Sequence, residues 1–133
     1  MIKFESVTKA YRSDSVALRD ANVDIAKGEF VFLVGPSGSG KSTFMRLVNK
    51  SEKPEEGRIF VAGKDIGELP GYKVPYLRRN IGAVFQDFKL LPNKTVLENI
   101  AFVPRVLGMV MSQQQRRTFQ VLKWVGLQHR MGA

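Results

Sequence analysis

The sequence of 133 residues predicts an α/β fold, and three observations support this prediction. Residues 2–7 and 21–25 alternate apolar and polar side chains, as strands with one exposed face do. An unbroken apolar run, Phe30–Val34, then precedes a glycine-rich stretch and a run of helical periodicity. After Gln86 the pattern becomes mainly helical. We expect an antiparallel N-terminal sheet, a core of strand, loop and helix, and the start of a helical subdomain.

Strands and one helix account for the first two thirds of the chain. Phe30–Val34 and Ile81–Phe85 lack alternation, which is typical of strands buried on both faces of a parallel sheet. A helix beginning at Lys41 and ending near Asn49 would bury Phe44, Leu47 and Val48 on one face. The expected strands are residues 2–7, 21–25, 30–34, 58–61 and 81–85, with turns at Lys27–Glu29 and Gly63–Asp65.

The last third predicts two helices. Thr95 with Glu98 has the T-x-x-E spacing of a capping box, in which the two side chains satisfy the first amides of a helix. Ser112 with Gln115 has an equivalent spacing and predicts a second helix start. That helix should end at a C-terminal cap on Gly126. Its expected buried residues are Phe119, Leu122, Trp124 and Val125.

The glycine-rich stretch Gly35–Thr43 fits the pattern G-x-x-x-x-G-K-[ST] and lies between a strand and a helix. Such a loop turns its backbone N–H groups toward an anion, and the following helix adds its positive dipole end. Lys41 would reach the β- and γ-phosphates, and the Ser42 hydroxyl would ligate Mg²⁺. The alternative is a glycine-rich turn that only caps a helix. The expected phosphate-binding residues are Gly35, Pro36, Ser37, Gly38, Ser39, Gly40, Lys41, Ser42 and Thr43.

Composition excludes several other classes. The chain has no cysteine and one histidine, so it offers neither a disulfide nor a thiolate metal site. No apolar run approaches the roughly 20 residues of a membrane-spanning helix. The net charge of +9 lies mainly after residue 70, where Asp87 and Glu98 are the only acidic residues. Because no nucleic-acid-binding motif accompanies this charge, we do not expect a nucleic-acid partner.

Two further residues make the chain resemble the ATP-binding cassette (ABC) ATPases. Tyr11, just past the first strand, is similar to the aromatic residue that stacks on adenine in that family. Gln86 resembles the Q-loop glutamine, which reaches Mg²⁺ and the attacking water and links the core to the helical subdomain. The alternatives are an aromatic packed on a sheet edge and a polar residue ending a strand. The resemblance implies a P-loop NTPase with a RecA-like core that binds ATP and Mg²⁺, with Lys41 and Gln86 in catalysis and Ser42 and Gln86 at the metal.

Within that family the chain resembles the FtsE group of bacterial cell division. The more discriminating match is Val74–Gly82, which contains Val-Pro-Tyr-Leu-Arg-Arg. The resemblance implies an FtsX-like integral membrane partner, control of cell-wall hydrolases, and a peripheral position on the cytoplasmic face of the membrane. It also implies a homodimer in the full-length protein. The expected organisation is one partial domain over residues 1–133, with a nucleotide-binding core in 1–86 and the Q-loop and helical subdomain in 87–133.

Parts of the family pattern are missing from these residues. The sequence contains no Ser-Gly-Gly signature and no apolar strand ending in two acidic residues. We therefore expect a truncated domain that binds ATP without efficient hydrolysis. Three alternatives stay open: the ATPase of a lipoprotein-release or efflux transporter, a nucleotide-binding module without turnover, and a small-molecule kinase. The kinase is disfavoured by the long antiparallel stretch before the loop.

Overall fold

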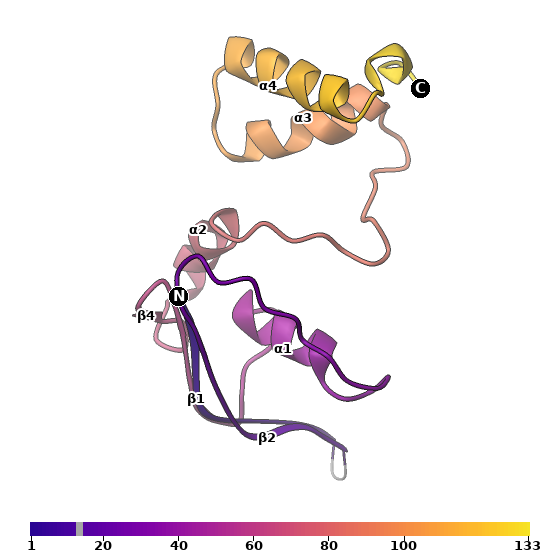
Figure 1. The fold of residues 1–133 in the computed structure, drawn as a ribbon. Coiled ribbons are helices and arrows are strands. Elements are labelled where there is room, and N and C mark those ends of the chain that lie inside the picture. Colours follow the sequence, from indigo (N-terminus) through magenta and orange to yellow (C-terminus); the bar gives the residue numbers. More distant parts are fainter. Residues whose placement is uncertain (13–14) are drawn as a thin grey trace. The chain divides into compact units, whose positions relative to one another are not determined.

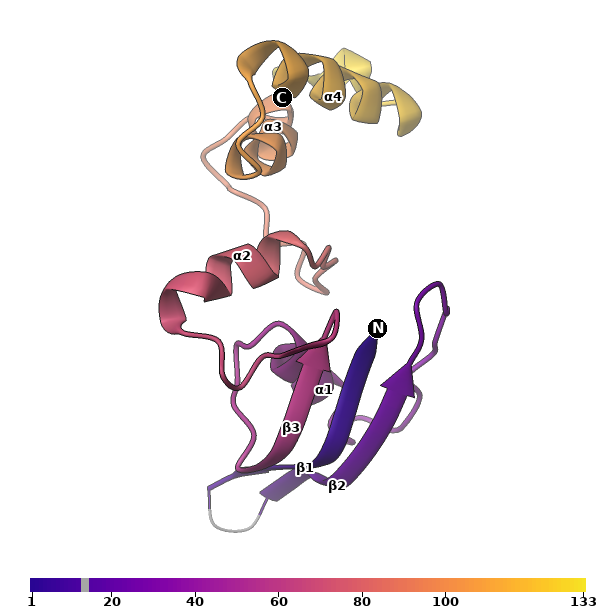
Figure 2. The ribbon, with the colours of Figure 1, turned by 90° about the vertical axis from the view of Figure 1, so that its left-hand side faces the viewer.

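The computed structural model describes residues 1–12 and 15–133, which divide into two compact units. The first unit, Met1–Ile81, contains a sheet with a helix against it, and the second, Gly82–Ala133, is helical. Figures 1 and 2 show the two units in different colours along the chain. The mixed α/β prediction is thereby confirmed. The expected domain boundary at residues 86 and 87 stays a prediction.

The first unit is built on a four-stranded antiparallel sheet with the order β2-β1-β3-β4. The strands expected near residues 2–7, 21–25 and 58–61 are confirmed, and each is longer than predicted. The expected turn at Gly63–Asp65 is confirmed at Gly63 but its bounds are wrong, because Val61 pairs with Lys64 and leaves only Ala62 and Gly63 in the loop. Both loop residues have positive φ, as a tight hairpin turn requires. The strands are β1 (Ile2–Tyr11), β2 (Ser15–Ile25), β3 (Glu56–Val61) and β4 (Lys64–Asp65).

Helix α1 (Lys41–Val48) packs on this sheet and forms the core with it. The Phe44 ring stacks on Phe4 of the central strand, with the ring centroids 4.4 Å apart. The helix ends at Asn49, whose carbonyl oxygen accepts a hydrogen bond from Arg78 Nε at 3.0 Å. Burial of Phe44, Leu47 and Val48 confirms the predicted helix face. The core residues are Phe4, Val7, Phe44, Leu47, Val48, Ile59, Val61 and Ile66.

The two expected parallel strands do not form in this structure. Residues 30–34 and 81–85 are extended segments outside the sheet, although their sequences are strongly apolar. Phe30, Phe32 and Val34 have exposed fractions of 84%, 79% and 83%. A strand exists only when its N–H and C=O groups pair with a neighbouring strand. Within residues 1–12 and 15–133, no segment pairs with either run.

The second unit is formed by helices α3 (Val96–Val106) and α4 (Met111–Trp124), which contact each other. The capping box at the start of α3 is confirmed, since Glu98 N donates to Thr95 Oγ1 and Thr95 N donates to Glu98 Oε2. In the part of the chain that the structure describes, no helix is both long and apolar enough to cross a membrane. The shorter helix of this unit is η2 (Gln128–Arg130), and the first unit also contains η1 (Gly71–Lys73) and α2 (Val74–Arg79).

Helix α4 corrects two predictions. It begins at Met111, so Ser112 lies within the first turn and makes no cap, and the expected second capping box is wrong. Trp124 is 66% exposed because α3 covers only the stripe of α4 that contains Thr118 and Leu122. The predicted cap at Gly126 is confirmed, since its N–H donates to the Lys123 carbonyl oxygen at 3.2 Å with φ at 71°. Phe119 and Val125, also expected inside, are at least half exposed.

Candidate functional site

The glycine-rich loop is shaped by two glycines in left-handed conformations. Gly38 has φ of 80° and Gly40 has φ of 89°, values that side chains with a Cβ rarely adopt. The turn Pro36–Ser39, which contains Gly38, is closed by Ser39 N, which donates to the Pro36 carbonyl oxygen at 3.2 Å. Gly40 also lies against β2, where an added Cβ would stand 2.3 Å from the Ala17 carbonyl oxygen. The loop therefore needs glycine at position 40 for both conformation and space.

Helix α1 begins immediately after Gly40, its N-cap residue. The amides at the start of an α-helix have no partner within the helix, and the positive end of the helix dipole lies there. The loop thus opens onto the features that bind anions at helix starts. Ser42 is exposed on this first turn, so its hydroxyl is accessible to a metal ion.

The Lys41 side chain folds back over the loop. Its ammonium donates to the carbonyl oxygens of Gly35 at 2.7 Å and Pro36 at 2.6 Å, and to Ser39 Oγ at 3.2 Å. These acceptors are neutral, whereas an anionic phosphate oxygen adds the attraction between opposite charges to the hydrogen bond. A phosphate entering the loop would therefore offer Lys41 better acceptors than the loop itself does.

Tyr11 ends β1 beside the loop. Its hydroxyl lies 3.4 Å from Thr43 Oγ1, which belongs to the first turn of α1. The structure therefore brings together an aromatic ring and the end of a phosphate-type loop, since Tyr11 and Thr43 are 32 positions apart in the sequence. This arrangement suits a ligand that has both a planar base and anionic groups.

A buried lysine that pairs with an exposed carboxylate lies next to Tyr11, and sequence reasoning missed this pair. Lys9 is only 8% exposed, and its Nζ lies 2.8 Å from Glu55 Oε1 and 3.7 Å from Glu52 Oε2. The hydrogen bond to Glu55 raises the pKa of Lys9. Hydrogen bonds from Lys9 and then from the Ala10 amide lower the pKa of the Glu55 carboxyl. One signal was available: Lys9 falls two residues after inward-facing Val7, where a charge requires a partner.

Gln86 lies in the second unit, in an exposed turn that follows the extended segment 81–85. The residues of the first unit that were predicted from sequence, Tyr11 and Gly35–Thr43, lie together, whereas Gln86 belongs to the other unit. Its predicted role at the metal and the attacking water stays a prediction.

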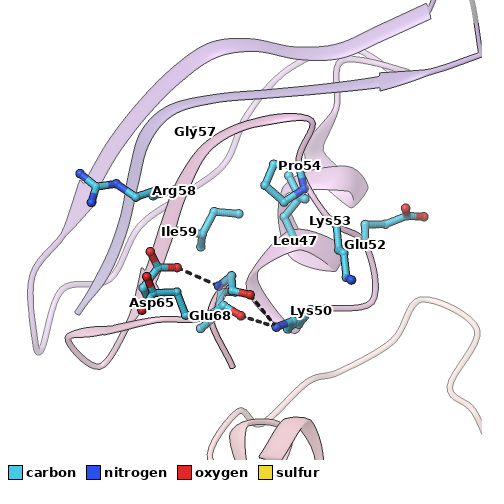
Figure 3. Close-up of a pocket in the computed structure, with 12 residues that line it drawn as sticks. Leu47, Lys50, Glu52, Lys53, Pro54, Gly57, Arg58, Ile59, Asp65 and Glu68 are labelled. Carbon is cyan, nitrogen blue, oxygen red and sulfur yellow. Dashed lines mark hydrogen bonds between the residues drawn. The ribbon is translucent and has the colours of Figure 1, made fainter. Parts of the chain in front are cut away.

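A separate pocket of about 410 Å³ lies in the first unit, away from the glycine-rich loop (Figure 3). Its central cation, Lys50, donates hydrogen bonds to the carbonyl oxygens of Ile66, Gly67 and Leu69, and burial lowers the pKa of its ammonium. Asp65 is engaged too, accepting the Gly67 amide at 2.8 Å. Because these charges already hold the segment after β4 against the end of α1, we assign the pocket a structural role.

The described residues contain no group of three or more His, Cys, Asp or Glu side chains that could hold a metal ion. Magnesium does not require such a cluster when phosphate oxygens and a hydroxyl supply its ligands. The candidate metal ligands therefore remain Ser42 and, by prediction, Gln86.

Comparison with known proteins agrees with the phosphate-binding geometry of the loop, because the matching proteins bind ATP. A family described as ABC transporter matches residues 18–132. The cell division ATP-binding protein FtsE of Bacillus subtilis (strain 168) is 46% identical over 130 residues, which are 98% of this chain and 57% of that protein. FtsE of Mycobacterium tuberculosis is 52% identical over 128 residues, which are 96% of this chain and 56% of that protein.

Transport proteins also match. The carnitine transport ATP-binding protein OpuCA of Listeria monocytogenes is 43% identical over 127 residues, covering 96% of this chain and 31% of that protein. Among solved structures, a dimeric ATP-binding cassette in a post-hydrolysis state with ADP and Pi has a TM-score of 0.87 and 34% identity. That match covers 99% of this chain and 60% of the solved chain. The chain therefore spans just over half the length of its cell-division relatives, and the predicted ABC-type fold is confirmed.

Proposed function

The chain belongs to the ABC transporter family, and from this premise we propose that it binds Mg–ATP as the ATP-binding subunit of an FtsE-type complex. One observation carries the nucleotide part of the proposal. The hydroxyl of Tyr11 lies 3.4 Å from Thr43 Oγ1, so a ring able to stack on adenine stands beside a loop able to hold phosphates.

The loop residues fit the phosphate chain of ATP. Gly38 and Gly40 leave the backbone free of side chains at the turn, and the first amides of α1 point toward the loop. Lys41 supplies a mobile ammonium for the β- and γ-phosphates. When bound, ATP with Mg²⁺ supplies the phosphoryl group whose transfer to water drives the family's cycle. Ser42 would hold the metal through its hydroxyl, and Gln86 through its amide oxygen.

Replacing Tyr11 by alanine tests the base-binding part of the proposal. The Tyr11→Ala variant should bind ATP about 1–3 kcal/mol more weakly, because loss of one aromatic platform removes base stacking of that size. Isothermal titration calorimetry with ATP measures the change.

The matched control is Tyr11→Phe, which retains the ring and removes only the hydroxyl that contacts Thr43. It should bind ATP nearly as well as the parent chain, within about 1 kcal/mol for one neutral hydrogen bond. Equal ATP affinity of Tyr11→Ala and the parent chain would contradict the assignment of Tyr11 to the base.

The FtsE-type assignment rests on similarity over nearly the whole chain. Identity with the FtsE relatives ranges from 41% to 52%, against 43% with a carnitine transport relative. We propose that the complete ATPase is a homodimer that works with an FtsX-like integral membrane partner, so that ATP binding and hydrolysis control cell-wall hydrolases. The subunit would then be peripheral, on the cytoplasmic face of the membrane.

A second candidate is the ATP-binding subunit of a small-molecule transporter, favoured by the matches to OpuCA proteins. Affinity purification of the tagged protein from its own membranes, followed by mass spectrometry, separates the two candidates. A co-purified FtsX-like protein supports cell division, and a co-purified solute permease supports transport.

Gln86 is proposed to act in turnover and not in ATP binding. In the complete ATPase, Gln86→Ala should leave the ATP dissociation constant within about twofold and lower the hydrolysis rate by roughly 10- to 100-fold, because positioning groups contribute on this scale. Phosphate release measures the rate, and calorimetry measures the affinity. A matched loss of both would show that Gln86 acts in binding.

The 133-residue chain by itself is proposed to bind ATP with little turnover. Its residues include neither the Ser-Gly-Gly signature nor the two-acid strand that the family resemblance assigns to hydrolysis. Phosphate-release assays on this chain and on the complete ATPase compare the two directly. Turnover by the short chain at the rate of the complete ATPase would contradict this part of the proposal.

A further inference from the structure

Lys9 is a cation held inside the first unit. It is 8% exposed and occupies an inward-facing position of the central strand β1. Removing an ammonium from water is unfavourable unless a counter-charge compensates, and Glu55 provides one at 2.8 Å. An apolar residue at this inward position would avoid the cost of removing an ammonium from water. The charged pair of Lys9 and Glu55 therefore points to a role toward a neighbouring group.

Glu55 uses its remaining groups to hold the end of β1. Its Oε2 accepts the Ala10 amide at 2.9 Å, and its own amide donates to the Thr8 carbonyl oxygen at 3.0 Å. The pairing of β1 with β3 reaches Thr8 opposite Glu56. On the β3 side, Glu55 therefore restrains β1 beyond the β1–β3 ladder, up to Ala10, while the ladder with β2 reaches Tyr11 itself.

The Tyr11 ring is contacted on two sides. Lys9 Nζ lies 5.2 Å from the ring centroid, within the range of a cation–π interaction. The two side chains share a strand face because they are two residues apart. At the other end of the ring, the hydroxyl lies 3.4 Å from Thr43 Oγ1. The ring is thus located between the buried ammonium and the first turn of α1.

From these contacts we propose that Lys9, through its pair with Glu55, is a positioning residue that fixes the Tyr11 ring for stacking on the base of a nucleoside triphosphate. The inference rests on the proposed function, since it assumes that Tyr11 binds the base. It goes beyond that function because Lys9, which is not among the phosphate-binding residues, would raise the affinity for the base by positioning Tyr11.

The test uses the Lys9→Met variant of the full 133-residue chain, with ATP and inorganic tripolyphosphate as two separate probes in calorimetry. Methionine keeps the length of the side chain and removes the charge. ATP should bind about 3- to 10-fold more weakly, the range that follows from a cation–π contribution to ring placement. Tripolyphosphate has no base, so its affinity should stay unchanged within twofold.

Two control variants exclude a general loss of structure. Lys9→Arg retains the cation and the pair with Glu55, and should restore most of the ATP affinity. Lys3→Met removes another lysine of the same strand, whose Nζ pairs with Glu5 at 2.7 Å and whose side chain is about half exposed. It should leave ATP affinity unchanged, because Lys3 does not contact Tyr11.

Several outcomes would overturn the inference. Equal weakening of ATP and tripolyphosphate by Lys9→Met would mean that the variant damages the fold or the phosphate loop. Unchanged ATP affinity in Lys9→Met, together with a loss in Tyr11→Ala, would reject this inference and leave the proposed function intact. Unchanged affinity in Tyr11→Ala would reject both. If Lys9→Met unfolds, the Lys9→Met/Glu55→Gln double variant, which leaves neither charge unpaired, takes its place with the same expected ATP loss.

Discussion

Replacing Lys41 by alanine should reduce ATP affinity at least about 100-fold, an effect close to loss of binding. The ammonium can make several hydrogen bonds to phosphate oxygens, and hydrogen bonds to charged groups contribute about 1.5–3 kcal/mol each. Because tenfold in affinity corresponds to about 1.4 kcal/mol, two such bonds account for the expected loss. Calorimetry with ATP on the parent chain and on Lys41→Ala measures it.

The loss should be specific to the position of the charge. Arg46→Ala removes one positive charge from the same helix, but at its exposed C-terminal end, and should change ATP affinity by less than about twofold. Among residues 1–12 and 15–133, Lys41 bonds to neutral acceptors of its own loop, so its removal should affect binding more than folding. Retained ATP affinity in Lys41→Ala would remove the basis for phosphate binding at this loop.

Replacing Gly40 by alanine should lower the free energy of unfolding by roughly 3 kcal/mol or more. A left-handed conformation costs a residue with a Cβ about 1–2 kcal/mol, and Gly40 has φ of 89°. The new Cβ would also stand 2.3 Å from the Ala17 carbonyl oxygen and 3.1 Å from Leu18 Cδ2, so α1 or β2 must shift. Urea unfolding without nucleotide, followed by circular dichroism, measures the change.

Gly38→Ala is the matched control for this prediction. Gly38 has nearly the same φ, 80°, but its added Cβ would meet nothing within 4 Å. Gly38→Ala should therefore lower the free energy of unfolding only by the cost of the left-handed conformation, about 1–2 kcal/mol. Equal destabilisation by the two variants would mean that the contact between Gly40 and β2 contributes nothing.

Local sequence patterns predicted the parts of this chain that depend on neighbouring residues. The capping box of Thr95 and Glu98, the Gly126 cap and the buried face of α1 are all set within one or two helical turns, and all three are confirmed. The apolar and polar pattern of residues 2–7 predicted β1 correctly, because one face of that strand packs on the core, and a register shift between Phe4 and Val7 keeps both of these residues buried. These predictions succeed because the interactions that decide them lie close together in the sequence.

Predictions that depended on distant partners were less successful. Phe30–Val34 is apolar enough for a buried strand, yet it stays outside the sheet because no described segment pairs with it. Trp124 was expected in the core, but only the stripe of α4 next to α3 is covered. Hydrophobicity indicates that a segment can be buried, and only the surrounding chain decides whether it is.

The sequence by itself determined that a glycine-rich loop precedes a helix, and it determined the residue types Lys41 and Ser42 that suit phosphate and Mg²⁺, because the loop motif is local. Tertiary structure alone decided that Tyr11 lies beside Thr43, that Gly40 lies against β2, and that Lys9 pairs with Glu55. Each of these contacts joins residues separated by more than twenty positions. Such contacts form only when the sheet and α1 pack around one core. They place the Tyr11 ring beside the loop and hold Gly40 against β2.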